Sequence, residues 1–444
     1  MFLTKNKCTP VWWGVIGIVV LSATLFLQAV LQTNIDTPIR GDSRDYLAYA
    51  FNLKTHGIYS RSWNEAEQHL PHPDALRAPG YPWLLSFFVD KSSKTFAITN
   101  LLLLQAMLGV VTVLLYLLLY CRFMSVGWAL AAGLITSISP HLINASVYVL
   151  SESVFTFLLA AHLLVLERAI RLKQIRWALL AGILLAISLL VRPTTQYLAL
   201  VYLMVVIARF RFVACQHWKI LASLIIPVIL VTAAWATRNV IETGRMSDPT
   251  LTANFLQHGM YINMMYEGHP ETYGYPYRFD PMNSEMAGKT GKILEEIGDR
   301  LWKEPARYSA WFLIGKPMQF FSWNLTESIG NAFIFAPIYS PYFDQGLFKV
   351  THALAKALHP FMMFFGVMGA FLAVLKTNKS LAATLMGVVM LYFLALHMIG
   401  APFPRYSIPI RPISYGLALF SLQAITHWIQ SRLKRRTVAR MFAD

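Results

Sequence analysis

The chain has 444 residues, of which 56% are hydrophobic and only 14% are charged. Soluble domains carry roughly 25% charged residues, so this composition excludes an ordinary soluble enzyme as well as a disordered or fibrous protein. The formal net charge of +16 fits either a nucleic-acid-binding surface or the basic inner loops of a membrane protein. The three cysteines, Cys8, Cys121 and Cys215, show neither disulfide-framework nor zinc-ligand spacing.

The hydrophobic residues gather in apolar stretches, several of them about 20 residues long, which is the length of a helix that crosses a bilayer. The first stretch is longer than the apolar region of a signal peptide and lacks a suitable cleavage site, so we expect an uncleaved anchor. The pattern predicts an all-α polytopic membrane protein with about ten transmembrane helices. In chain order the expected spans are 11–31, 96–120, 127–139, 151–167, 177–191, 194–209, 219–236, 350–375, 381–398 and 408–427.

Two long polar segments interrupt the spans, and the whole chain, 1–444, is expected to form a single membrane domain. The first outer loop covers 32–94, the second outer loop covers 237–348, and a basic tail occupies 428–444. Ten spans place both termini on one side of the membrane. The long loops are expected to carry short interfacial helices, including an apolar one over Arg307–Trp323.

The positive charge lies on one side of this arrangement. The short loops and the tail on the side of the termini hold nearly the whole basic excess, whereas the two long loops are almost balanced. The positive-inside rule explains this distribution, and nucleic acid is therefore not expected as a partner. We expect an integral protein of the plasma membrane (the inner membrane of a bacterium), with cytoplasmic termini and the long loops on the periplasmic or outer side.

The first outer loop contains a candidate catalytic carboxylate. Apolar residues at helical spacing predict an amphipathic helix over 46–53, and Asp42 lies near its start. Asp42 could serve as the helix N-cap, with Asp45 completing a capping box. Alternatively, it presents a carboxylate to a cleft at the membrane surface, and one residue can do both.

Several motifs, taken in order, resemble those of one family. They are GDSRDYLAYAFNL, HGIYS and LRAPGYPWLL in the first outer loop, then SPHLINASVYVLSESVFTFLL, LAISLLVRPTTQYLAL, PVILVTAAWATRNVIETG and APFPRYSIPI. Together they resemble the GT-C glycosyltransferases, in particular the bacterial membrane enzymes similar to protein O-mannosyltransferases and aminoarabinose transferases. Asp42-Ser43 stands where that group usually has a pair of acids, which argues against a metal site built on two carboxylates.

The resemblance implies a glycosyltransferase that uses a polyprenyl-phosphate sugar on the outer face and passes the sugar to a lipid, glycan or protein acceptor. A lipid phosphate is a good leaving group, so the main requirement is a base for the acceptor hydroxyl. The resemblance gives Asp42 that role. Cations must stabilise the departing phosphate, and Arg192, Arg238 and Arg405 are the candidates. Direct displacement would invert the anomeric carbon, and no metal or other cofactor is expected.

Other residues near the outer ends of the spans are candidates with structural alternatives. Glu152 opens a span, where an acid is either functional or favourable at the positive helix end. His141 could bind substrate or be structural, and Arg192 could contact phosphate or extend to the interface. Arg77 lies in a turn and could pair with a nearby acid. Further substrate contacts are expected from Asp45, Tyr46, Arg77, His141 and Tyr406.

Two other classes of protein remain possible on the sequence. A transporter or lipid flippase of lipid-linked glycans would favour charges within spans and broken helices in paired halves, whereas the mid-span positions here are nearly free of charge and no paired halves are found. A polysaccharide ligase or polymerase of different fold would not require the acidic first outer loop. Neither the sugar nor the acceptor can be read from the residues.

Overall fold

The computed structural model describes residues 9–62, 71–93, 95–210, 214–325, 331–375 and 380–441. Within these residues ten apolar helices form a bundle, because their continuous apolar surfaces pack against one another and against lipid. They are α1 (Thr9–Gln32), α4 (Ile98–Tyr120), α5 (Val126–Ser137), α7 (Glu152–Leu172), α8 (Ile175–Val191), α9 (Leu198–Phe210), α10 (Ala214–Thr243), α16 (Gly346–Leu375), α17 (Leu381–Ile399) and α18 (Arg411–Met441).

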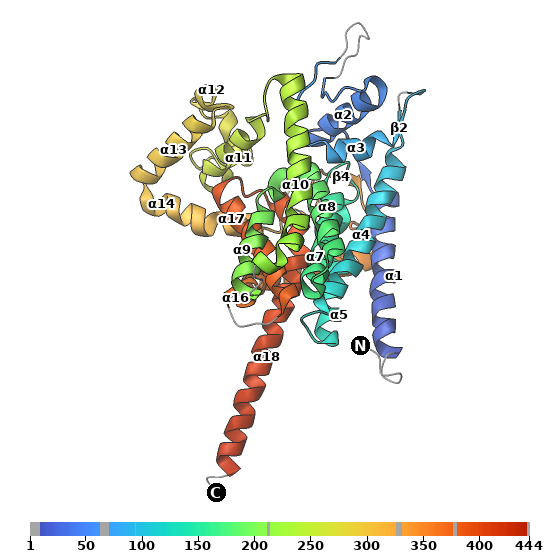
Figure 1. Cartoon of the computed structure of the whole chain (residues 1–444), viewed down its shortest axis with the longest axis vertical. Helices are drawn as coiled ribbons and strands as arrows, with labels where there is room; N and C mark the ends of the chain where they lie inside the picture. Colours follow the sequence, from blue (N-terminus) through green and yellow to red (C-terminus); the bar gives the residue numbers. More distant parts are fainter. Residues whose placement is uncertain are drawn as a thin grey trace.

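The ten helices correspond to the ten predicted spans, and the polytopic all-α fold class is confirmed. Within the described residues, six of them are long and apolar enough to cross a membrane, and α5 and α8 are shorter apolar helices. The number of ten spans therefore stays a prediction. In Figure 1 the first turns of α1 and the last turns of α18 lie at the same lower end of the molecule.

The helices pack in sequence-distant pairs as well as in neighbouring ones. α7 lies between α8 and α4, α10 packs on α8, and α16 packs along α18. Gly366 permits the last contact, since a Cβ there would lie 2.8 Å from the carbonyl oxygen of Ser414. Such small residues let helix backbones approach closely in a membrane bundle.

The first outer loop folds over the upper end of the bundle (Figure 1). Its elements are β1 (Asn34–Ile35), α2 (Asp42–His56), α3 (Gly80–Ser86), β2 (Val89–Asp90) and β3 (Thr95–Phe96). The predicted helix over 46–53 is part of α2, which begins earlier and ends later. Its apolar residues, such as Leu47 and Tyr49, are buried within the protein, because α2 packs on α3.

The second outer loop contributes most of the remaining elements. They are α11 (Thr250–Met260), η2 (Ile262–Met264), η3 (Pro270–Thr272), η4 (Pro276–Arg278), α12 (Asn283–Met286), α13 (Thr290–Lys303), α14 (Pro305–Ala310), η5 (Trp311–Gly315), α15 (Lys316–Phe320) and β4 (Pro337–Tyr339). β4 pairs antiparallel with β1 and so joins the two outer loops. The apolar helix expected over 307–323 is divided into α14, a π-helical turn and α15.

Three short connections complete the upper end of the bundle. They are α6 (Pro140–Ala145), η1 (Pro193–Thr195) and η6 (Pro404–Ile410). α6 and η6 contact each other, and η6 also contacts α7, α17 and α18. The candidate site described below lies beside these connections, at the point where the bundle meets the first outer loop.

Candidate active site at the upper end of the bundle

Gly41 sets the position of Asp42. Its backbone has φ 54° and ψ −128°, a conformation that glycine adopts readily and that other residues rarely reach. α2 then begins at Asp42, and Asp42 and Asp45 share its first turn. The prediction of an N-cap role for Asp42 is wrong, because Gly41 is the N-cap residue and no side chain caps this helix. Both acids still lie where the helix dipole favours negative charge.

Arg77 joins the two acids of α2. Its Nη2 donates to Asp42 Oδ1 (2.7 Å) and to Asp45 Oδ2 (2.9 Å), and its Nε also donates to Asp45 Oδ2 (3.1 Å). The guanidinium lies 5.7 Å from the centre of the Tyr46 ring. The turn that carries Arg77 is fixed at Gly80, where a Cβ would lie 2.8 Å from the backbone of Leu190. This close approach brings the first outer loop onto the end of α8.

Glu152 is the first residue of α7 and is completely buried. Its Oε1 accepts a hydrogen bond from Arg405 Nε (2.6 Å) and lies 3.2 Å from Arg192 Nη1. Arg192 ends α8 in an extended conformation, as expected for a residue before proline. Glu152 Oε2 is buried and has no hydrogen-bond partner among the described residues. The side-chain charge is thus matched by two arginines.

Arg405 connects the two groups of residues. Besides Glu152, it contacts Asp42, since its Nη2 donates to Asp42 Oδ2 (2.9 Å). Three carboxylates and three arginines therefore form one network of ion pairs. Its residues lie on α2, on the turn before α3, on α7, at the end of α8 and on η6. We call it the acid–arginine cluster, and its members are Asp42, Asp45, Arg77, Glu152, Arg192 and Arg405.

The arginines control the ionisation of Asp42. Burial alone would raise the pKa of this carboxyl, but the neighbouring Arg405 and Arg77 outweigh burial and lower its pKa to about 2. The side chain of Asp42 keeps 29% of its surface exposed, against 0% for Glu152. Asp42 is therefore an accessible, fully ionised carboxylate at neutral pH. Glu152 is the buried carboxylate that pairs with Arg192 and Arg405.

Two predicted contact residues lie against the cluster. The Arg192 guanidinium lies 5.3 Å from the centre of the Tyr406 ring, and Tyr46 packs edge-on against Tyr81 with a centroid distance of 5.0 Å. Cations over aromatic faces are stabilised by the ring quadrupole. Tyr406 and Tyr46 thus help to hold Arg192 and Arg77 in place.

Arg238 and His141 lie outside the cluster. Arg238 donates to the backbone carbonyls of Asp74 (2.6 Å) and Tyr59 (3.1 Å), so it holds the first outer loop against α10. His141 is hydrogen-bonded at both ring nitrogens, to Arg411 and to the Trp323 carbonyl. Burial, and then the Arg411 charge, hold its pKa well below the usual value, so the ring is neutral.

The sequence analysis missed Arg411. This residue falls inside the predicted span 408–427, and its side chain is fully buried. An arginine within an apolar span is costly and is a functional signal by default. That signal was present in the sequence, but it was hidden by the nearby prolines and by the Arg405-Tyr406 motif.

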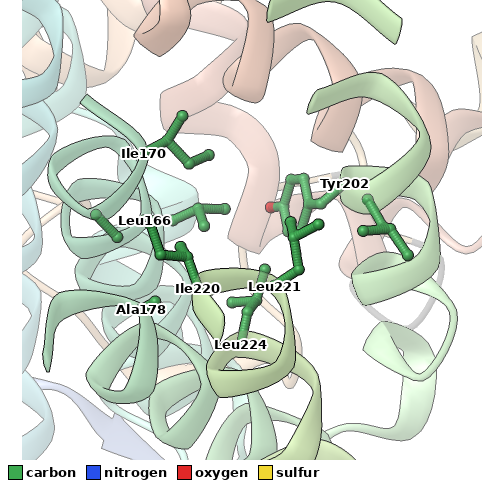
Figure 2. Close-up of a pocket in the computed structure, with 9 residues that line it drawn as sticks. Leu166, Ile170, Ala178, Tyr202, Ile220, Leu221 and Leu224 are labelled. Carbon is green, nitrogen blue, oxygen red and sulfur yellow. The ribbon is translucent and has the colours of Figure 1, made fainter. Parts of the chain in front are cut away.

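An apolar cavity lies elsewhere in the bundle, between α7, α8, α9 and α10. Figure 2 shows Leu166, Ile170 and Ala178 on one side of it and Tyr202 and Leu221 on the other. Ile170 is about 27 Å along α7 from Glu152, given a rise of 1.5 Å per residue. This cavity is therefore not part of the candidate site. Within the described residues, no three acidic, histidine or cysteine side chains are grouped as metal ligands.

The comparisons with known proteins agree with this architecture. A family model described as dolichyl-phosphate-mannose-protein mannosyltransferase matches residues 72–235. This segment runs from the turn that carries Arg77, through Glu152 and Arg192, to Trp235. No match was found among the curated proteins.

Several solved structures align with nearly the whole chain. The Archaeoglobus fulgidus oligosaccharyltransferase in the apo form has a TM-score of 0.52 at 14% identity, covering 98% of this chain and 53% of that chain. The same archaeal protein, AglB, in complex with an inhibitory peptide and a dolichol-phosphate has a TM-score of 0.52 at 14% identity, covering 97% and 52%. ArnT from Cupriavidus metallidurans bound to undecaprenyl phosphate has a TM-score of 0.42 at 14% identity, covering 95% and 78%.

The likeness to AglB concerns the fold, and this chain spans about half the length of that protein. The family model adds a match in sequence over the segment that carries Arg77, Glu152 and Arg192, which are three of the six members of the acid–arginine cluster. The chain is thus an integral, multi-pass membrane protein. The resemblance predicted from its motifs is confirmed: it resembles the GT-C glycosyltransferases, with the mannosyltransferase model matching residues 72–235 and the oligosaccharyltransferase fold extending over nearly all of its length.

Proposed function

We propose that this chain transfers a sugar from a polyprenyl-phosphate-linked donor to an acceptor hydroxyl at the outer face of the membrane. The observation that carries the proposal is the acid–arginine cluster, in which the partly exposed carboxylate of Asp42 pairs with Arg77 and Arg405, and Arg192 pairs with the neighbouring Glu152. The match to the mannosyltransferase family model supports a transferase. The acceptor is a lipid, a glycan or a protein, and the membrane is the inner membrane of a bacterium, with cytoplasmic termini.

The arginines provide the site for the donor phosphate. Planar guanidinium groups bind phosphate oxygens in pairs, and Arg192 and Arg405 keep 15% and 11% of their side chains exposed. The negative charge that develops as the lipid phosphate leaves would be stabilised by these cations. Arg238 is bound to backbone carbonyls, so we place the phosphate at Arg405 and Arg192.

Asp42 provides the base. In the unliganded protein its two carboxylate oxygens are paired with Arg77 and Arg405, which makes it a weak base because an opposite charge favours the ionised form. A bound phosphate would compete for Arg405 and reduce the positive charge at Asp42. The pKa of Asp42 would then rise, and the carboxylate would become a better acceptor for the proton of the attacking hydroxyl.

The reaction is a direct displacement. The acceptor oxygen attacks the anomeric carbon, Asp42 takes the hydroxyl proton, and the bond to the lipid phosphate breaks, so the anomeric configuration is inverted. Because arginines take the place of a metal cation at the phosphate, we expect transfer to be independent of added divalent metal. The distance of the apolar cavity in Figure 2 from the cluster leaves that cavity outside this mechanism.

A comparison of Asp42→Asn with Asp45→Asn tests the proposal. Both substitutions remove a carboxylate that pairs with Arg77, but only Asp42 also contacts Arg405. We expect Asp42→Asn to lower the turnover by about 10²–10⁴-fold, the usual contribution of a general base, and Asp45→Asn to have a much smaller effect. The assay uses purified protein, a panel of lipid-linked sugars, and samples with and without EDTA.

The outcomes separate this proposal from its rivals. Near-wild-type transfer by Asp42→Asn would remove Asp42 from the base role and direct attention to Glu152 or Asp45. A flippase would move lipid-linked glycan across vesicles without forming a new glycosidic bond. Loss of transfer with EDTA that is restored by a divalent metal would contradict the metal-independent scheme.

A further inference from the structure

Arg411, the first residue of α18, is a fully buried cation. Its partners include a serine hydroxyl, an imidazole, a backbone carbonyl and the side chain of Tyr415, and within the described residues none of these partners is a carboxylate. A buried charge without an opposite charge is expensive. Its presence at this point of the fold therefore requires an explanation beyond packing.

The Nε group of Arg411 is linked through Ser407 to the peptide bond that precedes Arg405. Arg411 Nε donates to Ser407 Oγ (3.2 Å), and Ser407 Oγ donates in turn to the carbonyl oxygen of Pro404 (2.7 Å). That carbonyl belongs to the same peptide group as the nitrogen of Arg405. The relay thus ends on the backbone of the residue that bridges Asp42 and Glu152.

The two Nη groups of Arg411 contact the second outer loop, Nη2 directly and Nη1 through His141. Nη2 donates to the carbonyl oxygen of Ser322 (2.8 Å), and Nη1 donates to His141 Nδ1 (2.7 Å). Because a guanidinium only donates, His141 Nδ1 must accept and the ring proton must lie on Nε2. His141 Nε2 then donates to the carbonyl oxygen of Trp323 (2.7 Å).

The backbone of η6 needs such support. It is a seven-residue 3₁₀-helix, a conformation with poor hydrogen-bond geometry that is uncommon at this length. Pro404 and Pro409 lack backbone N–H donors, which leaves fewer bonds within the helix itself. Hydrogen bonds from outside must therefore fix where η6 presents Arg405.

We infer that Arg411 and Ser407 are positioning residues that aim Arg405 at the donor phosphate and link its position to the second outer loop. This inference rests on the proposed role of Arg405 in binding that phosphate. A misplacement of about 1 Å in a group that binds the transition state can reduce a rate by about 10²-fold, so a relay to the Arg405 peptide affects catalysis without touching substrate.

Ser407→Ala tests the relay with a small change. It removes the hydroxyl that connects Arg411 to Pro404 and leaves every member of the acid–arginine cluster in place. We expect kcat to fall about tenfold, which corresponds to the net contribution of one hydrogen bond. The KM for the donor should stay close to that of the wild type, while the melting temperature should fall modestly, because the buried Arg411 Nε loses its acceptor; kcat is therefore compared at equal concentrations of folded protein.

Ser414→Ala is the matched control. Ser414 is also a fully buried serine, two turns of helix further along, and its hydroxyl donates to the Ile410 carbonyl (3.3 Å) outside the relay. Wild-type kcat in Ser414→Ala supports the inference. An equal loss of activity in both alanine variants would show an effect of packing alone and would overturn it.

The same pair of variants in an Arg405→Lys background separates the inference from the proposed function. If Ser407 acts through Arg405, Ser407→Ala should cause no further loss once Arg405 is replaced, and fully additive losses would overturn the inference. Slow transfer by Arg405→Lys together with wild-type transfer by Ser407→Ala would overturn the relay alone. Wild-type transfer by Arg405→Lys would instead overturn the proposed role of Arg405, and the relay with it.

Discussion

Asp42 has its two carboxylate oxygens in ion pairs with different arginines, Arg77 and Arg405, and this determines how its ionisation affects stability. Its pKa is about 2 in the folded protein, below the ordinary value of 3.8. The unfolded chain therefore binds the proton more readily, so ionised Asp42 favours folding above about pH 4. This contribution decreases as the pH falls from about 4 to about 2.

We predict that wild type is more stable than Asp42→Asn at pH 7 by about 2 kcal/mol, the energy that corresponds to this pKa shift. The difference should shrink below pH 4 and largely disappear near pH 2. Thermal unfolding of both proteins in detergent across this range measures it. A difference that does not change with pH would contradict the ion pairs.

Glu152 provides a second prediction at this scale. Its removal by Glu152→Gln leaves Arg192 and Arg405 partly buried without their shared anion, and breaking such a buried pair costs roughly 3–5 kcal/mol. Glu167→Gln is the control on the same helix, because in the described part of the chain Glu167 pairs with one arginine, the more exposed Arg171, and its loss should cost less. Equal melting temperatures for the two variants would argue against a structural role of Glu152 in the cluster.

The start of α2 depends on one backbone conformation. Gly41 has a positive φ of 54°, and a residue with a Cβ is strained there by about 1–3 kcal/mol. Since Asp42 follows directly, the strain would also shift the carboxylate relative to Arg77 and Arg405. The element that carries the candidate base is thus positioned by a glycine rather than by a capping side chain.

Gly41→Ala should therefore lower both the melting temperature and the transfer rate. Gly298→Ala is the control, since Gly298 lies in α13 with open space around its Cβ position, and alanine there should stabilise the helix by up to about 1 kcal/mol. Thermal unfolding and the transfer assay are measured on both variants. A fully active, stable Gly41→Ala protein would show that the start of α2 tolerates another conformation.

At the scale of the whole molecule, α1 begins and α18 ends at the same end of the bundle (Figure 1). Figure 1 shows the last turns of α18 at the end of the molecule opposite α2 and α3. With the basic tail on that end and the two outer loops on the other, the positive-inside rule predicts which end is cytoplasmic.

Reporter fusions test this orientation. Fusions after Lys173 and Arg436 should report a cytoplasmic location, and a fusion after Glu285 should report the outer side. Lys173 connects α7 to α8, Arg436 lies near the end of α18, and Glu285 lies in α12 of the second outer loop. An outward-facing Arg436 fusion would place the acid–arginine cluster on the cytoplasmic side and contradict the proposed donor presentation.

The sequence alone predicted where the ten helices and the two long segments between them lie, because hydropathy is a local property that can be read along the chain. It also proposed Glu152, Arg192 and Arg405 as candidates, since charged residues at the ends of apolar helices are few, and the resemblance added Asp42. It could not separate these from Arg238, which has the same position at a helix end but binds backbone carbonyls.

The tertiary structure alone decided which charges meet. Arg405 lies 363 residues from Asp42 and 253 from Glu152 along the chain, and the packing of η6 against α7 and α18 brings it between them. The same packing places His141 and Arg411 in a separate network. Ion pairing depends on distances of a few ångströms between side chains, and such distances are set by helix packing rather than by any local pattern in the sequence.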